Sequence, residues 1–392
     1  MKIGIFTFHH VDNFGALLQC LSLFQALQEM GHDVQVINHQ SPTAGLRAGL
    51  RHDLSNWTQL SYRLRGLIHG NKLHTAFDYF RRHSLPLTPL CETESQLAQL
   101  ANSFDALVAG SDQVWHFSRE PKYFSHWHPP FTNRRIAYAA CCGSDIQPDT
   151  DKALLSACLK KFNFISVRND FSANLIQQVS GTLPEVVCDP VLLVDPTPWV
   201  KRPPLRAGSY LLSYRVGSPI RGGEQTLMKH FQKQQGGLPW VWINGQSRRI
   251  HSPPPAEHKI WHSSPQEWLG WIQNCSFLLT DSFHAIQYAL KFKRPFLGYL
   301  TEPFRSARLM DLSKRYGLTA HIVGSVAEAL HASDLQPTAF SDQLIQSHVA
   351  QSRSQLSLFT GAFCLAYLYF HLRRIKRRMK AFFWCRERVI AR

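Results

Sequence analysis

Apolar blocks with strand-like and then helical spacing open the chain. Residues 2–8, KIGIFTF, form a short apolar run, and residues 16–31 carry apolar side chains at helical intervals. Gly31 ends this helical pattern, and residues 33–39 begin a second strand-like run. A strand, a helix and a strand of these lengths predict a right-handed βαβ crossover within a parallel sheet.

The same pattern recurs on both sides of a break in composition. Further apolar runs that end in polar residues cover 106–112, 135–141, 164–169 and 185–194. Residues 195–208, DPTPWVKRPPLRAG, are rich in Pro and charge and predict an interdomain linker. A second series of predicted strands then covers 210–216, 239–245, 277–282 and 295–300. A helix is predicted at 265–275, with its Pro in the first turn.

These elements predict an α/β protein with two Rossmann-like lobes, each built on a parallel sheet, around a deep interdomain cleft. A length of 392 residues also favours two domains. We place the N-terminal lobe at 1–194, the linker at 195–208, the C-terminal lobe at 209–340, and a C-terminal helix with a basic amphipathic tail at 341–392. Residues 44–84, rich in Arg and His, are predicted to form a peripheral helical segment.

The distribution of charge adds one feature to the predicted fold, a basic segment at the carboxyl end. The formal net charge is +16, and residues 371–392 contribute about half of it through nine Lys or Arg against one Glu. This concentration in one terminal segment argues against a nucleic-acid-binding surface. The rest of the chain is mildly basic, which suits an enzyme with anionic substrates.

An apolar run, residues 356–372, precedes these basic residues. It is slightly shorter than the roughly 20 residues that a bilayer span needs. Basic residues interleaved with Phe382, Phe383 and Trp384 are typical of a helix lying on anionic lipid. Docking of this helix on the protein, with a solvated basic end, and a true span are the alternatives.

Cysteine usage and the amino terminus predict where the protein works. The nine cysteines include no CxxC pair, which fits a reducing compartment better than a disulfide framework. The amino terminus lacks the apolar segment and cleavage site of a signal peptide. We therefore expect a cytoplasmic protein that is peripheral on the inner face of the cytoplasmic membrane.

Polar residues at predicted strand ends are the candidate site residues. In TDSFHAIQYAL, residues 280–290, His284 lies between a strand and a helix, where it is either a catalytic group or a polar turn residue. Asp12 and Asn13 follow the first strand and either bind a ligand or cap the next helix. Asp112 and Trp115 in GSDQVW either contact a sugar or belong to a turn with a buried Trp.

Arginines near strand ends suggest anion binding. Arg168, Arg305 and Arg308 are placed to bind phosphate or carboxylate, and salt bridges are the alternative for each of them. The twenty histidines include no HExxH spacing, and no GxGxxG, GxSxG or Walker loop is present. We expect neither a metal site nor a bound cofactor.

Together these segments resemble the polysaccharide pyruvyl transferase family. The resemblance runs from residue 1 to about residue 330 and depends on GSDQVW, VRNDFS and TDSFH in this order. It implies a GT-B-like fold and transfer of the enolpyruvyl group of phosphoenolpyruvate, a co-substrate, to a sugar diol. The acceptor would be a bacterial cell-surface polysaccharide or its lipid-linked precursor, and the product a pyruvate ketal.

The resemblance also implies roles for individual residues. His284 corresponds to the family's histidine and would act as the catalytic acid or base or contact the phosphate of the donor. The donor would be bound by Arg168 of the N-terminal lobe and by three residues of the C-terminal lobe, Ser282, Arg305 and Arg308. The acceptor would contact residues of the N-terminal lobe, namely Asp12, Asn13, Asp112 and Trp115.

One position departs from the family. Better-studied members carry Arg-Leu-His where this chain has Ser282-Phe283-His284, and Arg305 or Arg308 are the arginines that could compensate. A GT-B-type glycosyltransferase with a nucleotide-sugar donor is the alternative function. A membrane-associated scaffold with a decayed site is a further alternative.

Overall fold

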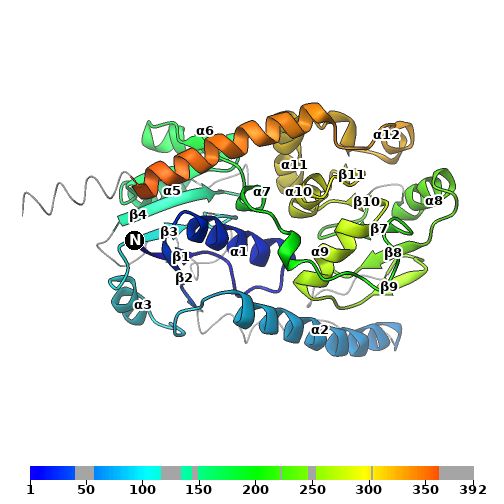
Figure 1. Cartoon of the computed structure of the whole chain (residues 1–392), viewed down its shortest axis with the longest axis horizontal. Helices are drawn as coiled ribbons and strands as arrows, with labels where there is room; N and C mark the ends of the chain where they lie inside the picture. The colour runs from blue at the N-terminus through cyan, green and yellow to red at the C-terminus, as the bar shows by residue number, and fades with distance from the viewer. Residues whose placement is uncertain are drawn as a thin grey trace, which may run out of the picture.

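The computed structural model describes residues 1–39, 57–115, 134–143, 149–220, 223–245, 253–301 and 303–361. Within them the chain forms two parallel six-stranded sheets with helices packed on them (Figure 1). The predicted α/β class with two parallel sheets is confirmed. In the described part of the chain, no helix is long and apolar enough to cross a bilayer.

The first sheet has the strand order β2-β1-β3-β4-β5-β6. Its strands are β1 (Lys2–Phe6), β2 (Asp33–Val36), β3 (Ala106–Ala109), β4 (Arg134–Ala140), β5 (Phe164–Val167) and β6 (Glu185–Val186). The helices of this part are α1 (Phe14–Glu29), α2 (Trp57–Ser84), α3 (Glu94–Ala101), α5 (Asp149–Leu159), α6 (Asp170–Ser180) and α7 (Pro190–Leu193).

The second sheet has the order β12-β11-β10-β7-β8-β9. Its strands are β7 (Leu211–Tyr214), β8 (Trp240–Ile243), β9 (His258–Ile260), β10 (Phe277–Thr280), β11 (Phe296–Tyr299) and β12 (Ile322–Val323). Its helices are α8 (Glu224–Gln234), α9 (Pro265–Asn274), α10 (Phe283–Lys291), α11 (Pro303–Tyr316) and α12 (Val326–His331). The 3-10 turns η3 (Thr197–Trp199) and η4 (Thr319–His321) lie between these elements.

The predicted strands match this order, with differences at the sheet edges. Only the first two residues of the apolar run at 185–194 form a strand, because Asp189 and Pro190 start the short helix α7. The edge strands β9 and β12 were not predicted, since runs of three and two residues carry no periodic signal. The strands divide between the two sheets at the predicted linker, and the lobe boundaries stay a prediction.

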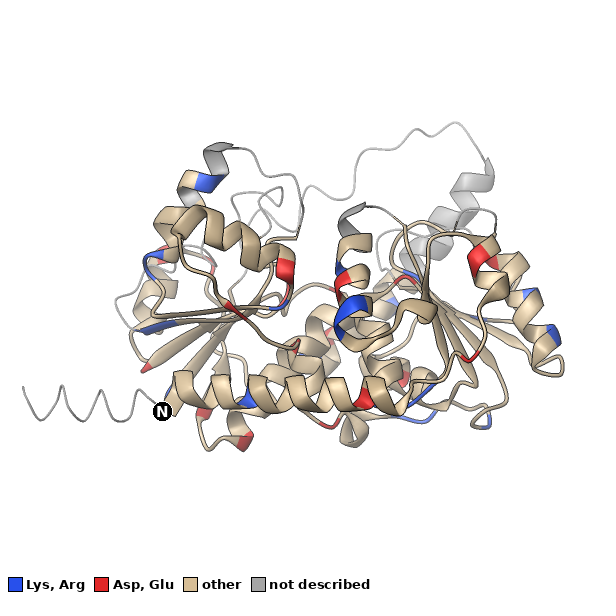
Figure 2. Ribbon diagram, turned by 90° about the horizontal axis from the view of Figure 1, so that it is seen from above, with Lys and Arg blue, Asp and Glu red and all other residues tan. Residues whose placement is uncertain are grey.

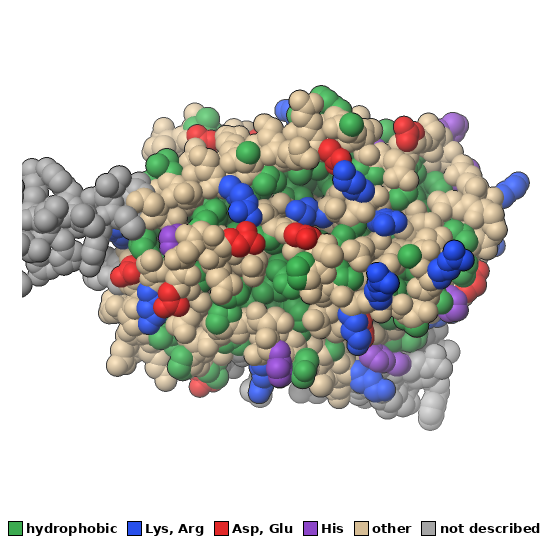
Figure 3. All heavy atoms as spheres, viewed as in Figure 1, with side chains coloured by type: hydrophobic (Ala, Val, Ile, Leu, Met, Phe, Trp, Pro, Cys, Tyr) green, Lys and Arg blue, Asp and Glu red, His purple; other side chains and the backbone are tan. Residues whose placement is uncertain are grey.

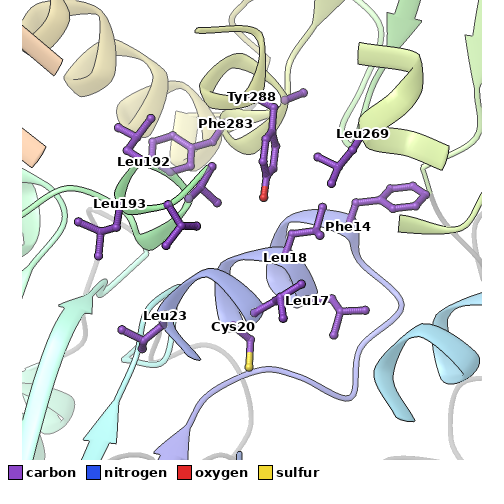
Figure 4. Packing of buried hydrophobic residues seen from close by; sticks show 14 of the residues in the cluster. Phe14, Leu17, Leu18, Cys20, Leu23, Leu192, Leu193, Leu269, Phe283 and Tyr288 are labelled. Carbon is purple, nitrogen blue, oxygen red and sulfur yellow. The ribbon is translucent and has the colours of Figure 1, made fainter. Parts of the chain in front are cut away.

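One hydrophobic cluster spans both lobes. Helix α1 of the first lobe packs against α9 and α10 of the second and against α7 (Figure 4). The Phe14 ring, at the start of α1, stacks on Trp268 of α9 with centroids 5.0 Å apart and an interplanar angle of 4°. Leu17 and Leu18 of α1 belong to the same cluster as Tyr288 of α10, and all three are buried. The lobes therefore share one hydrophobic cluster, and three further clusters of described residues lie within single lobes.

Two long helices cross from one lobe to the other. Helix α2 runs along one side of the molecule, and a helix at 339–361 returns from the second lobe to the first along the opposite side (Figures 1 and 2). On the first lobe, Ser352 Oγ accepts a hydrogen bond from the Cys188 backbone N–H at 2.9 Å. Arg353 forms an ion pair with Glu29 of α1 at 2.7 Å.

Two predicted segments lie partly outside the described residues. Helix α2 confirms the helical segment predicted at 44–84 over residues 57–84. Residues 40–56 lie outside the described part of the chain. Of the predicted C-terminal segment, the helix at 339–361 is described and the basic tail at 362–392 is not.

Replacing Phe14 by Ala should destabilise both lobes together. The ring is fully buried in the shared core, so the Phe14→Ala variant should lose about 3–5 kcal/mol of unfolding free energy. Phe340, 62% exposed, is the matched control, and its replacement by Ala should cost less than about 0.5 kcal/mol. Urea denaturation followed by circular dichroism and Trp fluorescence measures both effects. Equal losses in the two variants would contradict the shared core.

Candidate active site

The turn between β10 and α10 is fixed by its own polar side chains. Ser282 caps α10, and its hydroxyl accepts a hydrogen bond from the Ala285 N–H at 3.3 Å. Asp281 accepts from the Val216 and Gly217 N–H groups at 2.7 and 2.6 Å, which ties this turn to the loop after β7. These two residues therefore build the turn that carries His284.

His284 projects from the second lobe into contacts with the first. The residue is 7% exposed, and its Nε2 lies 3.6 Å from Asp189 Oδ2. The other edge of the ring lies over Gly15 in the first turn of α1. A Cβ added at Gly15 would be 2.1 Å from His284 Nδ1 and 2.5 Å from Cγ. Gly15 is thus explained by the close approach of the imidazole.

Asp189 is the centre of the polar contacts around this histidine. Its Oδ2 accepts a hydrogen bond from Arg168 Nη1 at 2.7 Å and one from Ser111 Oγ at 3.4 Å. Its Oδ1 accepts from the Val191 N–H at 3.1 Å and caps α7. Burial raises the pKa of Asp189, but His284, Arg168 and the Val191 N–H outweigh burial, and the pKa is lowered overall. The carboxyl is therefore held as a buried carboxylate.

Arg168 links this carboxylate to a second one. Its Nη2 donates to Asp112 Oδ1 at 2.8 Å, and its side chain is only 1% exposed. The guanidinium also lies 4.9 Å from the ring centroid of Phe283, next to His284. A buried cation between two carboxylates satisfies charges that would be costly alone. Arg168 is thus an enclosed ionic link, which is the salt-bridge alternative to its predicted role in anion binding.

Asp12 and Asn13 both make contacts within the protein. Asp12 accepts from Arg81 Nη2 at 3.0 Å and contacts His74 Nδ1 at 2.8 Å, which joins the loop after β1 to α2. Asn13 caps α1, and its side chain accepts from the Ala16 N–H at 3.0 Å. Asn13 therefore makes the predicted capping contact, and Asp12 makes ion-pair contacts that the sequence did not predict.

The remaining predicted residues are spread more widely. Trp115 is fully buried and packs edge-on against Phe162, with centroids 5.5 Å apart, so it presents no ring face to a sugar. Arg308 of α11 lies 5.8 Å from the centroid of the Phe283 ring, which is therefore close to two arginines. Arg305 belongs to α11, but its side chain lies outside the described part of the structure.

Sequence reasoning missed Asp189 and Gly15. Asp189 lies inside the run predicted at 185–194, and its Asp-Pro pair, a helix-start signal, could have shown that the strand ends before it, which places Asp189 at the sheet edge. Gly15 gave no comparable signal, because a glycine beside a capping residue is common at helix starts. Among the described residues, no group of three or more His, Cys, Asp or Glu could hold a metal ion.

The contact between Gly15 and His284 can be tested through stability alone. Gly15→Ala should lower the free energy of unfolding by about 1–3 kcal/mol, because the new methyl group collides with the imidazole. In a His284→Ala background the same change should stabilise by up to about 1 kcal/mol, the usual helix preference for Ala. Urea denaturation of the four proteins measures the coupling.

Gly361 is the control for this prediction. A Cβ added there meets nothing within 4 Å, so Gly361→Ala should be neutral or slightly stabilising. If Gly15→Ala has the same effect with and without the imidazole, the ring does not lie over Gly15.

Solved structures with a similar fold identify the type of two-lobed arrangement. The chain is similar to a UDP-GlcNAc 2-epimerase from Neisseria meningitidis bound to UDP-GlcNAc, with 10% identity and a TM-score of 0.50 over 92% of this chain and 99% of that one. It also matches UGT89C1 from Arabidopsis thaliana complexed with UDP-L-rhamnose, with 10% identity and a TM-score of 0.47 over 91% and 97% of the two chains. At such identity the epimerase likeness concerns the fold alone, and it confirms the GT-B-like arrangement.

Comparison of the sequence with protein families indicates the type of activity. No curated protein matches the chain. The family model described as polysaccharide pyruvyl transferase matches residues 13–303, which is most of the chain and includes Arg168, Asp189 and His284. The chain therefore belongs to the polysaccharide pyruvyl transferase family and is a transferase.

Proposed function

We propose that the protein transfers the enolpyruvyl group of phosphoenolpyruvate to two hydroxyls of one sugar. The acceptor is a bacterial cell-surface polysaccharide or its lipid-linked precursor, and the product is a cyclic pyruvate ketal. Family membership supports pyruvyl transfer to a polysaccharide. The observation that carries the proposal further is His284, held between the lobes against the buried pair of Asp189 and Arg168.

The reaction needs a group that both gives and takes protons. A proton added to the methylene carbon of the donor makes a methyl group and leaves an oxocarbenium-like centre at C2. The first sugar hydroxyl adds to C2 and gives up its proton, the bond between C2 and the phosphate oxygen breaks, and the second hydroxyl closes the ketal. The proton of one hydroxyl restores the catalyst and the other leaves with phosphate. An imidazole suits this exchange near neutral pH.

The donor carries a carboxylate and a phosphate and needs cations. We assign these anions to Arg308 and Arg305 of α11, because Arg168 is already paired with Asp112 and Asp189. In this proposal Arg168 orients the carboxylates around His284 without contacting the donor.

Smaller roles fall to the other predicted residues. Ser282 shapes the turn of His284, and Asp12, Asn13 and Trp115 shape the first lobe. Asp112, whose side chain is 14% exposed, is the candidate for contact with the acceptor.

Replacing His284 should abolish most of the activity. Phosphate released from phosphoenolpyruvate is measured with a lipid extract of the producing cells as the acceptor source. His284→Ala should lower the rate by about 10²- to 10⁴-fold, the usual contribution of general acid–base catalysis. His331, exposed on α12, is the matched control, and His331→Ala should keep the full rate. Full activity of His284→Ala would refute the catalytic role, and release of UDP or GDP from a nucleotide sugar would favour the glycosyltransferase alternative.

We further propose that the basic tail at residues 371–392 binds the anionic inner face of the cytoplasmic membrane. The nine Lys or Arg of this segment support the proposal. On the face of the protein seen in Figure 3, blue basic side chains lie singly among acidic and hydrophobic ones and do not gather in one basic surface. The body of the protein therefore offers less attraction for lipid on this face than the tail does.

Deletion of residues 371–392 should move the protein from the membrane fraction to the soluble fraction. Binding to vesicles that contain phosphatidylglycerol should fall to the level seen with neutral vesicles, because the charge attraction is lost. A variant with the nine basic residues replaced by Gln keeps the length and the aromatic residues and serves as a control for charge. An unchanged distribution after deletion would rule out the tail as the anchor.

A further inference from the structure

Asp189 is the carboxylate that faces the His284 ring in the described part of the chain. It lies on the first lobe, at the start of α7, whereas His284 lies on the second lobe, in the first turn of α10. The Asp189 side chain is fully buried, and that of His284 is 9% exposed. The two residues therefore meet where bulk water cannot screen their interaction.

Asp189 cannot readily turn away from the imidazole. Its Oδ1 is engaged by the Val191 N–H, and its Oδ2 is engaged by Arg168 and Ser111. These contacts come from three separate elements of the first lobe, so the carboxylate group is fixed in position. Its Oδ2 is the oxygen that lies 3.6 Å from His284 Nε2.

The two nitrogens of His284 have different surroundings. Nε2 is buried from solvent and makes no hydrogen bond, and Asp189 Oδ2 lies 3.6 Å from it, within ion-pair distance. A carboxylate accepts hydrogen bonds only, so a proton on Nε2 is favoured and a lone pair there is repelled. Nδ1 lies on the edge of the ring that contacts Gly15. A proton that passes between the ring and a substrate must therefore pass through Nδ1.

The other elements around the ring bring few competing charges. Helix α1 carries no acidic side chain in its first turn, and α7 consists of apolar residues. Lys291 lies at the far end of α10. Arg168 contacts the same oxygen of Asp189, and Arg308 of α11 lies beside the neighbouring Phe283 ring. Of these groups, Asp189 is the one that stabilises a protonated imidazole.

We propose that Asp189 is a positioning residue that keeps a proton on Nε2 of His284, which leaves Nδ1 as the nitrogen that exchanges protons with the substrate. The inference rests on the proposed function only in taking His284 as the catalytic acid and base. Asp189 itself contacts no substrate atom. Its contribution is the choice of tautomer and the orientation of the ring, as second-layer carboxylates provide for other active-site histidines.

Asp189→Asn tests this role by changing the charge while keeping the shape. The Asn oxygen that remains with Arg168 takes the place of Oδ2 and still lies beside Nε2, but it carries no negative charge, so the preference for a proton on Nε2 should weaken. The rate of phosphate release should fall by about 10- to 100-fold.

Asp311→Asn is the matched control. Asp311 of α11 also pairs with an arginine, Arg315, and accepts a backbone N–H, that of Asp170, at the contact between the lobes. Its loss should lower stability but leave the tautomer of His284 unchanged. An equal loss of rate in both variants, with the same His284 tautomer in both, would mean that Asp189 acts only in packing, and would overturn the proposal.

Nitrogen NMR tests the tautomer without any acceptor. In protein labelled with ¹⁵N-histidine, the His284 signals are those missing from His284→Gln. Neutral His284 should carry its proton on Nε2 in the wild-type protein and in Asp311→Asn, and the share with the proton on Nδ1 should rise in Asp189→Asn because the carboxylate charge is lost. A proton on Nδ1 in the wild-type protein would overturn the inference even if Asp189→Asn failed to fold. An Nε2 proton without any phosphate release from phosphoenolpyruvate would instead count against the proposed function.

Discussion

The burial of charge between the lobes is the constraint on which the site depends. Asp112, Arg168 and Asp189 form a chain in which each charge has an opposite neighbour within ion-pair distance, and His284 Nε2 lies 3.6 Å from the last carboxylate. Charged groups this far from water are tolerated only when they are paired, so removing one member would leave another unsatisfied. The same pairing holds the guanidinium and the carboxylates in fixed orientations. The site is therefore ordered before any substrate arrives.

Helix α1 joins this polar chain to the apolar core. Phe14 stacks on Trp268 in the core shared by the lobes, and the next residue, Gly15, receives the His284 ring. Two adjacent residues in one helical turn thus fix both the contact between the lobes and the place of the imidazole. A shift of α1 by a fraction of an ångström would be felt in the site, because closely packed interiors transmit small displacements.

Much of the fold could be predicted from sequence because hydrophobic periodicity is local. Ten of the twelve strands, and the helices α1, α9 and α10, follow from local apolar runs, whereas β9 and β12 are too short to show a pattern. The position of His284 could be predicted as well, since a strand that leads into a helix places it at a sheet edge. The ion pairs between the side chains of this site could not be predicted from the sequence. Arg168 has the same sequence pattern whether it faces a ligand or two carboxylates, and only the folded chain brings Asp112 and Asp189 to it.

Gly15 has a consequence for the history of this protein family. The residue is required to be small by the imidazole that covers it, and a glycine within a helix is otherwise unfavourable. In a descendant that lost His284, position 15 would no longer have to be glycine, and a larger residue there would increase the stability of α1. The two positions should therefore change together among relatives, and a side chain at position 15 would mark lineages in which this centre has stopped working.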